Sequence, residues 1–191
     1  MYFKQSLLAL TAVLSSSVTV ADDAPLLLPV QRLDVGIAMK AAQATLEACR
    51  KEGLNIAVTI IDRGGHAQVV LRDTMAMPIT VPISKQKAYA AMNFNLPTSE
   101  LETRFTSPFA PPKIDGLITS AGGLPITAGS SIVGGIGVSG APSGETDQAC
   151  AKAGLDAISI DLEMECNRQL LTGIQACVQR LRCTRVPVSR M

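Results

Sequence analysis

Hydrophobic residues recur at helical spacing near the start of the chain. They place one apolar stripe on a helix over residues 35–52, made by Ile37, Ala38, Ala41, Ala44, Thr45 and Ala48. Asp34 stands where its side chain can cap the first turn, and Gly53 follows in the position that favours a left-handed C-cap. The pattern therefore predicts a helix with one face toward a core.

Two apolar runs follow, over residues 55–62 and 67–72, separated by Arg63, two glycines and His66. Short β-rich runs on either side of a glycine turn are typical of a hairpin, so we predict two antiparallel strands here. Residues 74–82 contain two prolines and read as a loop. A helix is then expected from Ser84 to about Asn93, and a second, short helix up to Phe105.

Glycine-spaced apolar residues dominate the next part of the chain. They predict strands over residues 116–120, 124–127 and 131–139. Polar residues 143–147 then offer capping oxygens to a helix with its apolar positions at Ala149, Ala153, Leu155 and Ile158. Consecutive strands joined by tight turns exclude a doubly wound dinucleotide fold. The expected fold class is α/β of the α+β kind, an antiparallel sheet with helices packed on it.

Three of these segments together resemble the GlcG/HbpS family, also called DUF336, which is related to the C-terminal domain of corrinoid adenosyltransferases. They are the hairpin at residues 56–73, the lysine-containing helix at 84–101 and the glycine-rich strand and helix at 121–158. The resemblance implies a profilin- or PAS-like sandwich, haem or a related tetrapyrrole as ligand, and homo-oligomers. The family includes haem-degrading proteins, but an enzymatic role for this chain is left open.

His66 is the only histidine of the chain, and we predict it as the axial ligand of haem iron. Tyr89 is the next candidate, and Met75, Met77 and Met92 are nearby sulfur donors. The alternative is a solvated turn histidine without a role.

Three cations could pair with haem propionates, namely Arg72, Lys85 and Lys87, or they could be ordinary surface charges. Gly122 and Gly123, together with residues 134–137, would give a flat backbone wall for a porphyrin face or a neighbouring subunit.

Composition narrows the function classes. Aromatic residues make up 3% of the 191 residues and tryptophan is absent, which argues against stacking on single-stranded nucleic acid. The sequence has no phosphate-binding P-loop motif and no G-x-S-x-G nucleophile motif. No titratable cluster suggests a catalytic mechanism.

The first 21 residues have the layout of a signal peptide, with Lys4 before an apolar run and Ala21 at the expected cleavage site. We therefore expect a periplasmic or secreted bacterial protein, with the haem-binding domain at residues 22–164. Residues 165–191 form a basic extension, in which five arginines and no acidic residue follow position 166. This extension would contact an acidic partner or anionic lipid, or would be solvated.

Five cysteines are present at positions 49, 150, 166, 177 and 183. Export permits disulfides and leaves one thiol over. Cys150 and Cys166 would lie too far apart on one continuous helix, and pairing of Cys166 with Cys177 or Cys183 would require the tail to turn back.

Two hypotheses of function follow. The first is an exported haem-binding protein that supports haem capture or degradation, with haem as its cofactor. The second is a ligand-free, oligomeric accessory protein of an exported oxidoreductase system. The role of His66 separates them.

Overall fold

The structure is a computed structural model that describes residues 27, 30–104, 115–168 and 171. The chain divides into two compact units, residues 1–30 and 31–191, and the fold described below is that of the second unit. The predicted signal peptide and most of the basic extension lie outside the described residues. Among the helices that the structure describes, none has the length and apolar character needed to cross a membrane.

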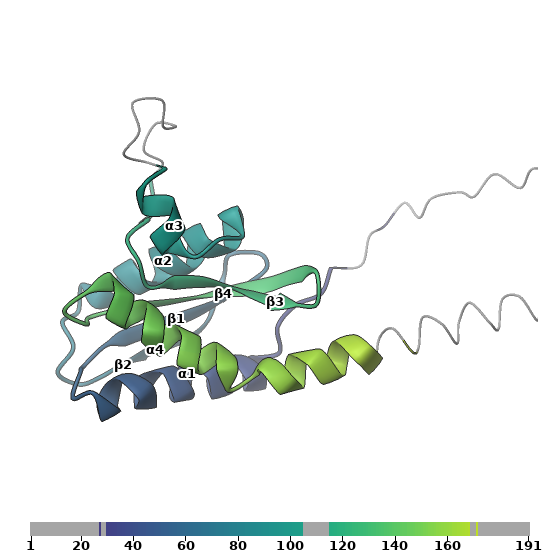
Figure 1. Cartoon of the computed structure of the whole chain (residues 1–191), viewed down its shortest axis with the longest axis horizontal. Helices are drawn as coiled ribbons and strands as arrows, with labels where there is room; N and C mark the ends of the chain where they lie inside the picture. The colour runs from purple at the N-terminus through teal and green to yellow at the C-terminus, as the bar shows by residue number, and fades with distance from the viewer. Residues whose placement is uncertain (1–26, 28–29, 105–114, 169–170, 172–191) are drawn as a thin grey trace, which may run out of the picture. The chain divides into compact units, whose positions relative to one another are not determined.

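An antiparallel sheet of four strands lies at the centre, in the order β2-β1-β4-β3. The strands are β1 (Ala57–Asp62), β2 (Ala67–Arg72), β3 (Gly123–Ala128) and β4 (Ser131–Ser139). Helices α2 (Thr80–Phe94) and α3 (Thr98–Glu102) lie on one side of it. Helices α1 (Val35–Lys51) and α4 (Gly144–Asp156) lie on the other, and residues 159–168 continue as a further helix (Figure 1). The predicted fold class is confirmed.

Strand β4 presents large aliphatic side chains to the layer of α1 and α4, and glycines to α2. Its side chains alternate between the faces of the sheet. Ile136 and Val138 belong to the aliphatic core that includes residues of α1 and α4. Gly135 and Gly137 face α2, since a Cβ at these positions would lie 2.5 Å from the Ala88 carbonyl oxygen and 2.0 Å from that of Ser84. The missing side chains thus let the backbone of α2 rest directly on the sheet.

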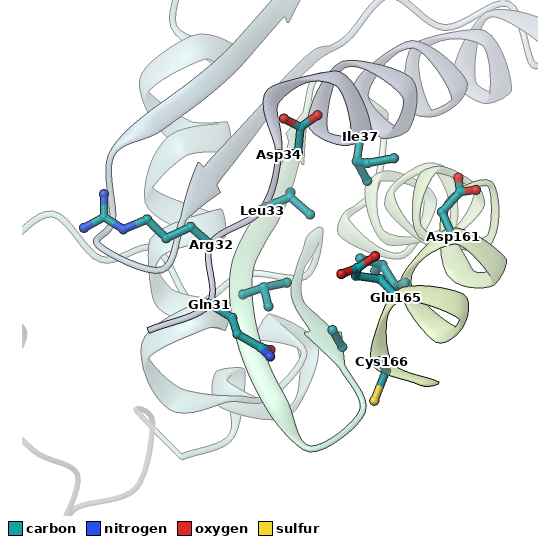
Figure 2. A pocket seen from close by; sticks show the side chains of 11 residues that line it. Gln31, Arg32, Leu33, Asp34, Ile37, Asp161, Glu165 and Cys166 are labelled. Carbon is teal, nitrogen blue, oxygen red and sulfur yellow. The ribbon is translucent and has the colours of Figure 1, made fainter. Parts of the chain in front are cut away.

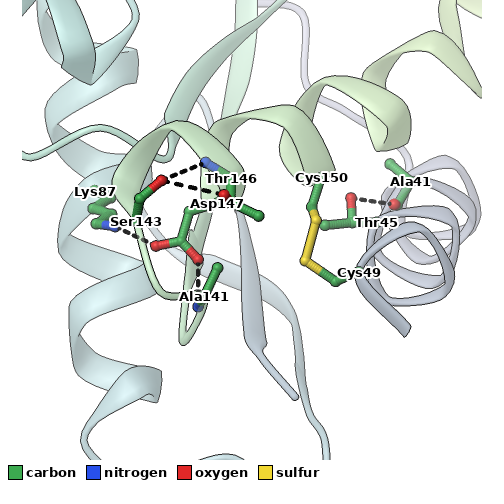
Figure 3. The surroundings of a disulfide bond; sticks show 9 residues. All are labelled: Ala41, Thr45, Cys49, Lys87, Ala141, Ser143, Thr146, Asp147 and Cys150. Carbon is green, nitrogen blue, oxygen red and sulfur yellow. Dashed lines mark hydrogen bonds and ion pairs between the residues drawn. A yellow bond between two sulfur atoms is a disulfide. The ribbon is translucent and has the colours of Figure 1, made fainter. Parts of the chain in front are cut away.

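Small residues likewise allow a close approach of α1 and α4. A Cβ at Gly154 would lie 1.9 Å from Thr45 Oγ1, and Ala41 and Ala151 are fully buried at the same contact. A disulfide joins Cys49 of α1 to Cys150 of α4, with a Cα–Cα distance of 5.5 Å (Figure 3). Sequence reasoning did not find this pair. Cys166 is free, and Cys177 and Cys183 lie outside the described residues.

Two predictions of secondary structure were wrong. Helix α2 begins at Thr80 and not at Ser84, because Pro82 falls in the first turn, where its missing N–H has no partner to lose. The strand expected at 116–120 is absent, and side chains of α3 bind the backbone that follows it. Glu102 Oε1 accepts from the N–H of Ala121, at 2.6 Å.

Candidate functional site

The turn between β1 and β2 is organised by one carboxylate. Asp62 Oδ1 accepts hydrogen bonds from the backbone N–H groups of Gly64, at 2.8 Å, and His66, at 2.9 Å. The backbone closes the same turn, since Asp62 N donates to the His66 carbonyl and Gly65 N donates to the Asp62 carbonyl, both at 2.9 Å. Asp62 therefore fixes where His66 leaves the sheet.

The imidazole of His66 is exposed but has a defined neighbour. Its side chain is 80% accessible, and its Nδ1 lies 3.5 Å from Asp62 Oδ1. A Cβ at Gly64 would lie 2.9 Å from the same nitrogen and 3.2 Å from Cε1. The ring thus lies against the glycine of the turn with its Nδ1 near the carboxylate.

The charge of Asp62 is stabilised by its surroundings. The N–H of His66 is the main cause that lowers the pKa of the Asp62 carboxyl, against the opposing effect of burial. The N–H of Gly64 lowers this pKa further, and so do the charges of His66 and Arg32. Arg32 Nη1 lies 3.7 Å from Asp62 Oδ2. Asp62 is therefore ionised at neutral pH.

A shallow hollow of about 440 Å³ lies beside this turn. Its lining includes Gly65 from the turn, together with Lys85 and Tyr89 from α2. The Tyr89 ring covers Gly65, because a Cβ there would lie 2.6 Å from Tyr89 Cε2, and Gly65 has a positive φ of 82°. Lys85 and Tyr89 are four residues apart and share one face of the helix. The fold thus brings the Tyr89 ring onto the residue that precedes His66 and places Lys85 at the same hollow.

The other predicted site residues lie elsewhere. Arg72 ends β2, six residues beyond His66, or roughly 20 Å along an extended strand. Its Nη1 donates to the carbonyl oxygens of Thr74 and Ala76. Lys87 is buried in an ion pair with Asp147 and does not face the hollow. We leave both cations out of the proposed site.

The predicted glycine wall is occupied by the protein itself. A Cβ at Gly122 would lie 2.8 Å from Lys87 Nζ, and one at Gly123 would lie 2.5 Å from the Lys87 carbonyl oxygen. The close approach that the glycines permit is therefore that of α2. A role in cofactor binding at these two positions stays a prediction that this packing does not support.

A second cavity, of about 350 Å³, shares none of its lining residues with the hollow beside the turn (Figure 2). Residues 31–34, Ile37 of α1, the ends of β3 and β4, and the helical segment 159–168 enclose it, with the free Cys166 at its edge. It has an apolar floor that includes Leu33 and Val133. None of the predicted haem-site residues lines it. Within the described part of the chain, no group of three metal-ligating side chains was found.

Sequence reasoning did not single out Asp62, the carboxylate that organises this turn. The signal was present, because the aspartate stands directly before the turn whose histidine was singled out, and an aspartate at that place commonly accepts backbone hydrogen bonds. Arg32 carried no such signal, since it is distant in sequence and meets Asp62 only in the folded chain.

Comparison with known proteins places these features in a family. Residues 33–156 match the family described as "Haem degrading protein HbpS-like". A crystal structure of HbpS is 39% identical, covers 73% of this chain and 99% of its own, and superposes with a TM-score of 0.67. The complex of PduOC with haem is 24% identical over 66% of this chain and 95% of its own, with a TM-score of 0.62, and this likeness concerns the fold. An uncharacterised 15.0 kDa protein of Citrobacter freundii, from the dhaT-dhaS intergenic region, is 28% identical over 66% of this chain and 92% of its own.

Proposed function

The chain belongs to the HbpS-like family of haem-degrading proteins, and on that premise we propose that it binds haem or a closely related tetrapyrrole at the β1–β2 turn. His66 is the proposed iron ligand. The observation that carries this assignment is an exposed imidazole on the turn whose Gly65 lines a hollow, with one ring nitrogen near a carboxylate. The structure of PduOC, which has the same fold, is a complex with haem.

The residues around the hollow fit such a ligand. The imidazole supplies a nitrogen donor for iron. The Tyr89 ring offers an apolar face for a porphyrin, and Lys85 offers a cation for a propionate. Bound haem would supply redox-active iron, and the chain's own residues bind and orient it. Haem capture is the function that these groups support, and a degradative role would also require an external oxidant, dioxygen or a peroxide, to oxidise the bound haem.

The experiment is a titration of the full chain with hemin, followed by the Soret band. We expect a saturable, shifted band that is lost in His66→Ala. Lys85→Ala should weaken binding by up to about fivefold, the effect of an exposed ion pair. Lys152→Ala is the matched control, since it removes an exposed lysine from α4 on the other side of the sheet.

Each result has a clear meaning. No shift at stoichiometric hemin would overturn the haem proposal and favour a ligand-free accessory protein that assembles into oligomers. Binding that persists unchanged in His66→Ala would move the ligand to Tyr89, which Tyr89→Phe then tests. Native mass spectrometry of the same samples determines the size of the proposed homo-oligomer.

Export is the second part of the proposal. It is supported by the layout of the first 21 residues and by the disulfide, which forms in oxidising compartments. Expression in a bacterium should yield a periplasmic or secreted protein that begins at Asp22. A cytoplasmic product that retains Met1 would contradict it.

A further inference from the structure

One oxygen of Asp62 contacts both the backbone of the β1–β2 turn and the surroundings of the His66 ring. Asp62 Oδ1 accepts from the N–H groups of Gly64 and His66 and lies 3.5 Å from His66 Nδ1. The side chain is 10% exposed, so this carboxylate acts from a partly desolvated position, where charge interactions are less screened than in water.

We propose that Asp62 is the positioning residue of His66: it keeps the imidazole proton on Nδ1 and leaves the lone pair of Nε2 directed away from the turn. The inference rests on the proposed function only in its last step, the use of Nε2 as the ligand atom for iron. Its first step concerns the chain alone.

Charge determines which tautomer is favoured. A carboxylate oxygen 3.5 Å from Nδ1 attracts a proton on that nitrogen more than one on the farther Nε2. Free histidine in water prefers the opposite tautomer, with the proton on Nε2. The structure thus predicts an inversion of the usual preference.

The contact also orients the ring. Nδ1 and Cε1 lie against Gly64, whose backbone φ is not in the left-handed region, so alanine is tolerated there by the backbone alone. A methyl group at this position would displace the ring and would also crowd Asp62 Oδ1, which lies 3.2 Å from the Cβ position, while the carboxylate keeps its charge. A carboxylate behind a ligating histidine fixes the tautomer and raises the basicity of the free nitrogen.

The test uses the fact that His66 is the only histidine of the chain. In untagged protein labelled with 15N, long-range proton–nitrogen spectra report the tautomer of one ring without assignment. We expect the Nδ1–H form to dominate in the haem-free wild type. In Asp62→Asn the ratio of Nδ1–H to Nε2–H should fall by about fivefold, which corresponds to about 1 kcal/mol.

Asparagine retains an oxygen that can accept the two backbone hydrogen bonds, so the turn should persist, and circular dichroism checks the fold. If Asp62→Asn fails to fold, Gly64→Ala gives a second readout, because its methyl group disturbs the contact between the carboxylate and the ring without removing the charge. A wild type in the Nε2–H form, or a ratio unchanged in both variants, would overturn the inference.

Haem-loaded protein distinguishes the two proposals. If hemin does not bind but the tautomer is Nδ1–H, the proposed function fails and the positioning role stands. In the wild type the carboxylate makes the imidazole more basic, and a more basic imidazole stabilises oxidised iron. If hemin binds through His66, Asp62→Asn should therefore raise the reduction potential of the haem. Binding through His66 with an unchanged tautomer and potential would reject Asp62 as the positioning residue.

Discussion

Lys87 Nζ and Asp147 Oδ2 lie 2.8 Å apart across 60 residues of sequence, and each side chain is only 5% exposed. The pair joins α2 to the first turn of α4, and the second carboxylate oxygen of Asp147 accepts from the N–H of Ala141, at 3.0 Å (Figure 3). A lysine predicted to meet a ligand thus holds the two helical layers together at one end of the sheet.

Removal of one partner should destabilise the protein strongly. Asp147→Asn leaves the Lys87 ammonium buried without a counter-charge, and we expect the free energy of unfolding to fall by about 3–5 kcal/mol. The double variant Lys87→Met with Asp147→Asn removes both charges and should recover a large part of this loss. Urea unfolding measures all three proteins. A loss below about 1 kcal/mol in Asp147→Asn would contradict a structural role for the pair.

The disulfide between Cys49 and Cys150 closes a loop of 101 residues. Because the bond restricts the unfolded chain, the variant with alanine at both positions should lose roughly 2–4 kcal/mol of stability. Cys166→Ala removes the free thiol and should change stability by no more than about 0.5 kcal/mol. Thermal unfolding compares them, and equal midpoints for wild type and the double variant would argue against the bond.

Among the glycines that face α2, Gly137 leaves the least room for a side chain. Alanine there would place its Cβ 2.0 Å from the Ser84 carbonyl oxygen, so α2 must shift. We expect a loss of about 1–3 kcal/mol or more from such overpacking. Ser131→Ala, at the exposed start of the same strand, is the control and should be nearly neutral. Urea unfolding that ranks the two variants equally would refute the contact.

The sequence predicted elements whose signals are local. Helix α1 follows from a helical stripe and from Asp34, whose side chain does accept from the N–H of Gly36. Strands β2 and β4 have the predicted bounds, because the turn residues that separate the apolar runs also end the strands. The family was recognised from these same local segments.

What the sequence did not predict depends on contacts between distant residues. Cys49 lies within bonding distance of Cys150 because small residues let α1 and α4 pack closely. The spacing of the cysteines along the chain does not predict this packing. The burial of Lys87 depends on Asp147 in the same way. At the candidate site, Lys85 and Tyr89 line one hollow together with Gly65 of the His66 turn, whereas Arg72 is separated by the length of β2.

Acid should reveal the contribution of Asp62 to stability. Its folded-state pKa lies below the ordinary value of 3.8, chiefly because the N–H of His66 binds the charged form. A lowered folded-state pKa means that the unfolded chain binds the proton first, so the stabilisation is fully present above the unfolded value and is lost as pH falls through the folded one. Asp62→Asn has no such charge to lose.

The wild type should therefore be more stable than Asp62→Asn at about pH 7, and the difference in free energy of unfolding should shrink below about pH 4. Asp156→Asn is the control, since that carboxylate is exposed and pairs only with Lys152 in the next turn of the same helix. Urea unfolding at a series of pH values measures the difference. A difference between wild type and Asp62→Asn that stays constant down to about pH 2 would show that the turn binds the neutral carboxyl as well as the charged one, and that Asp62 acts there by shape and not by charge.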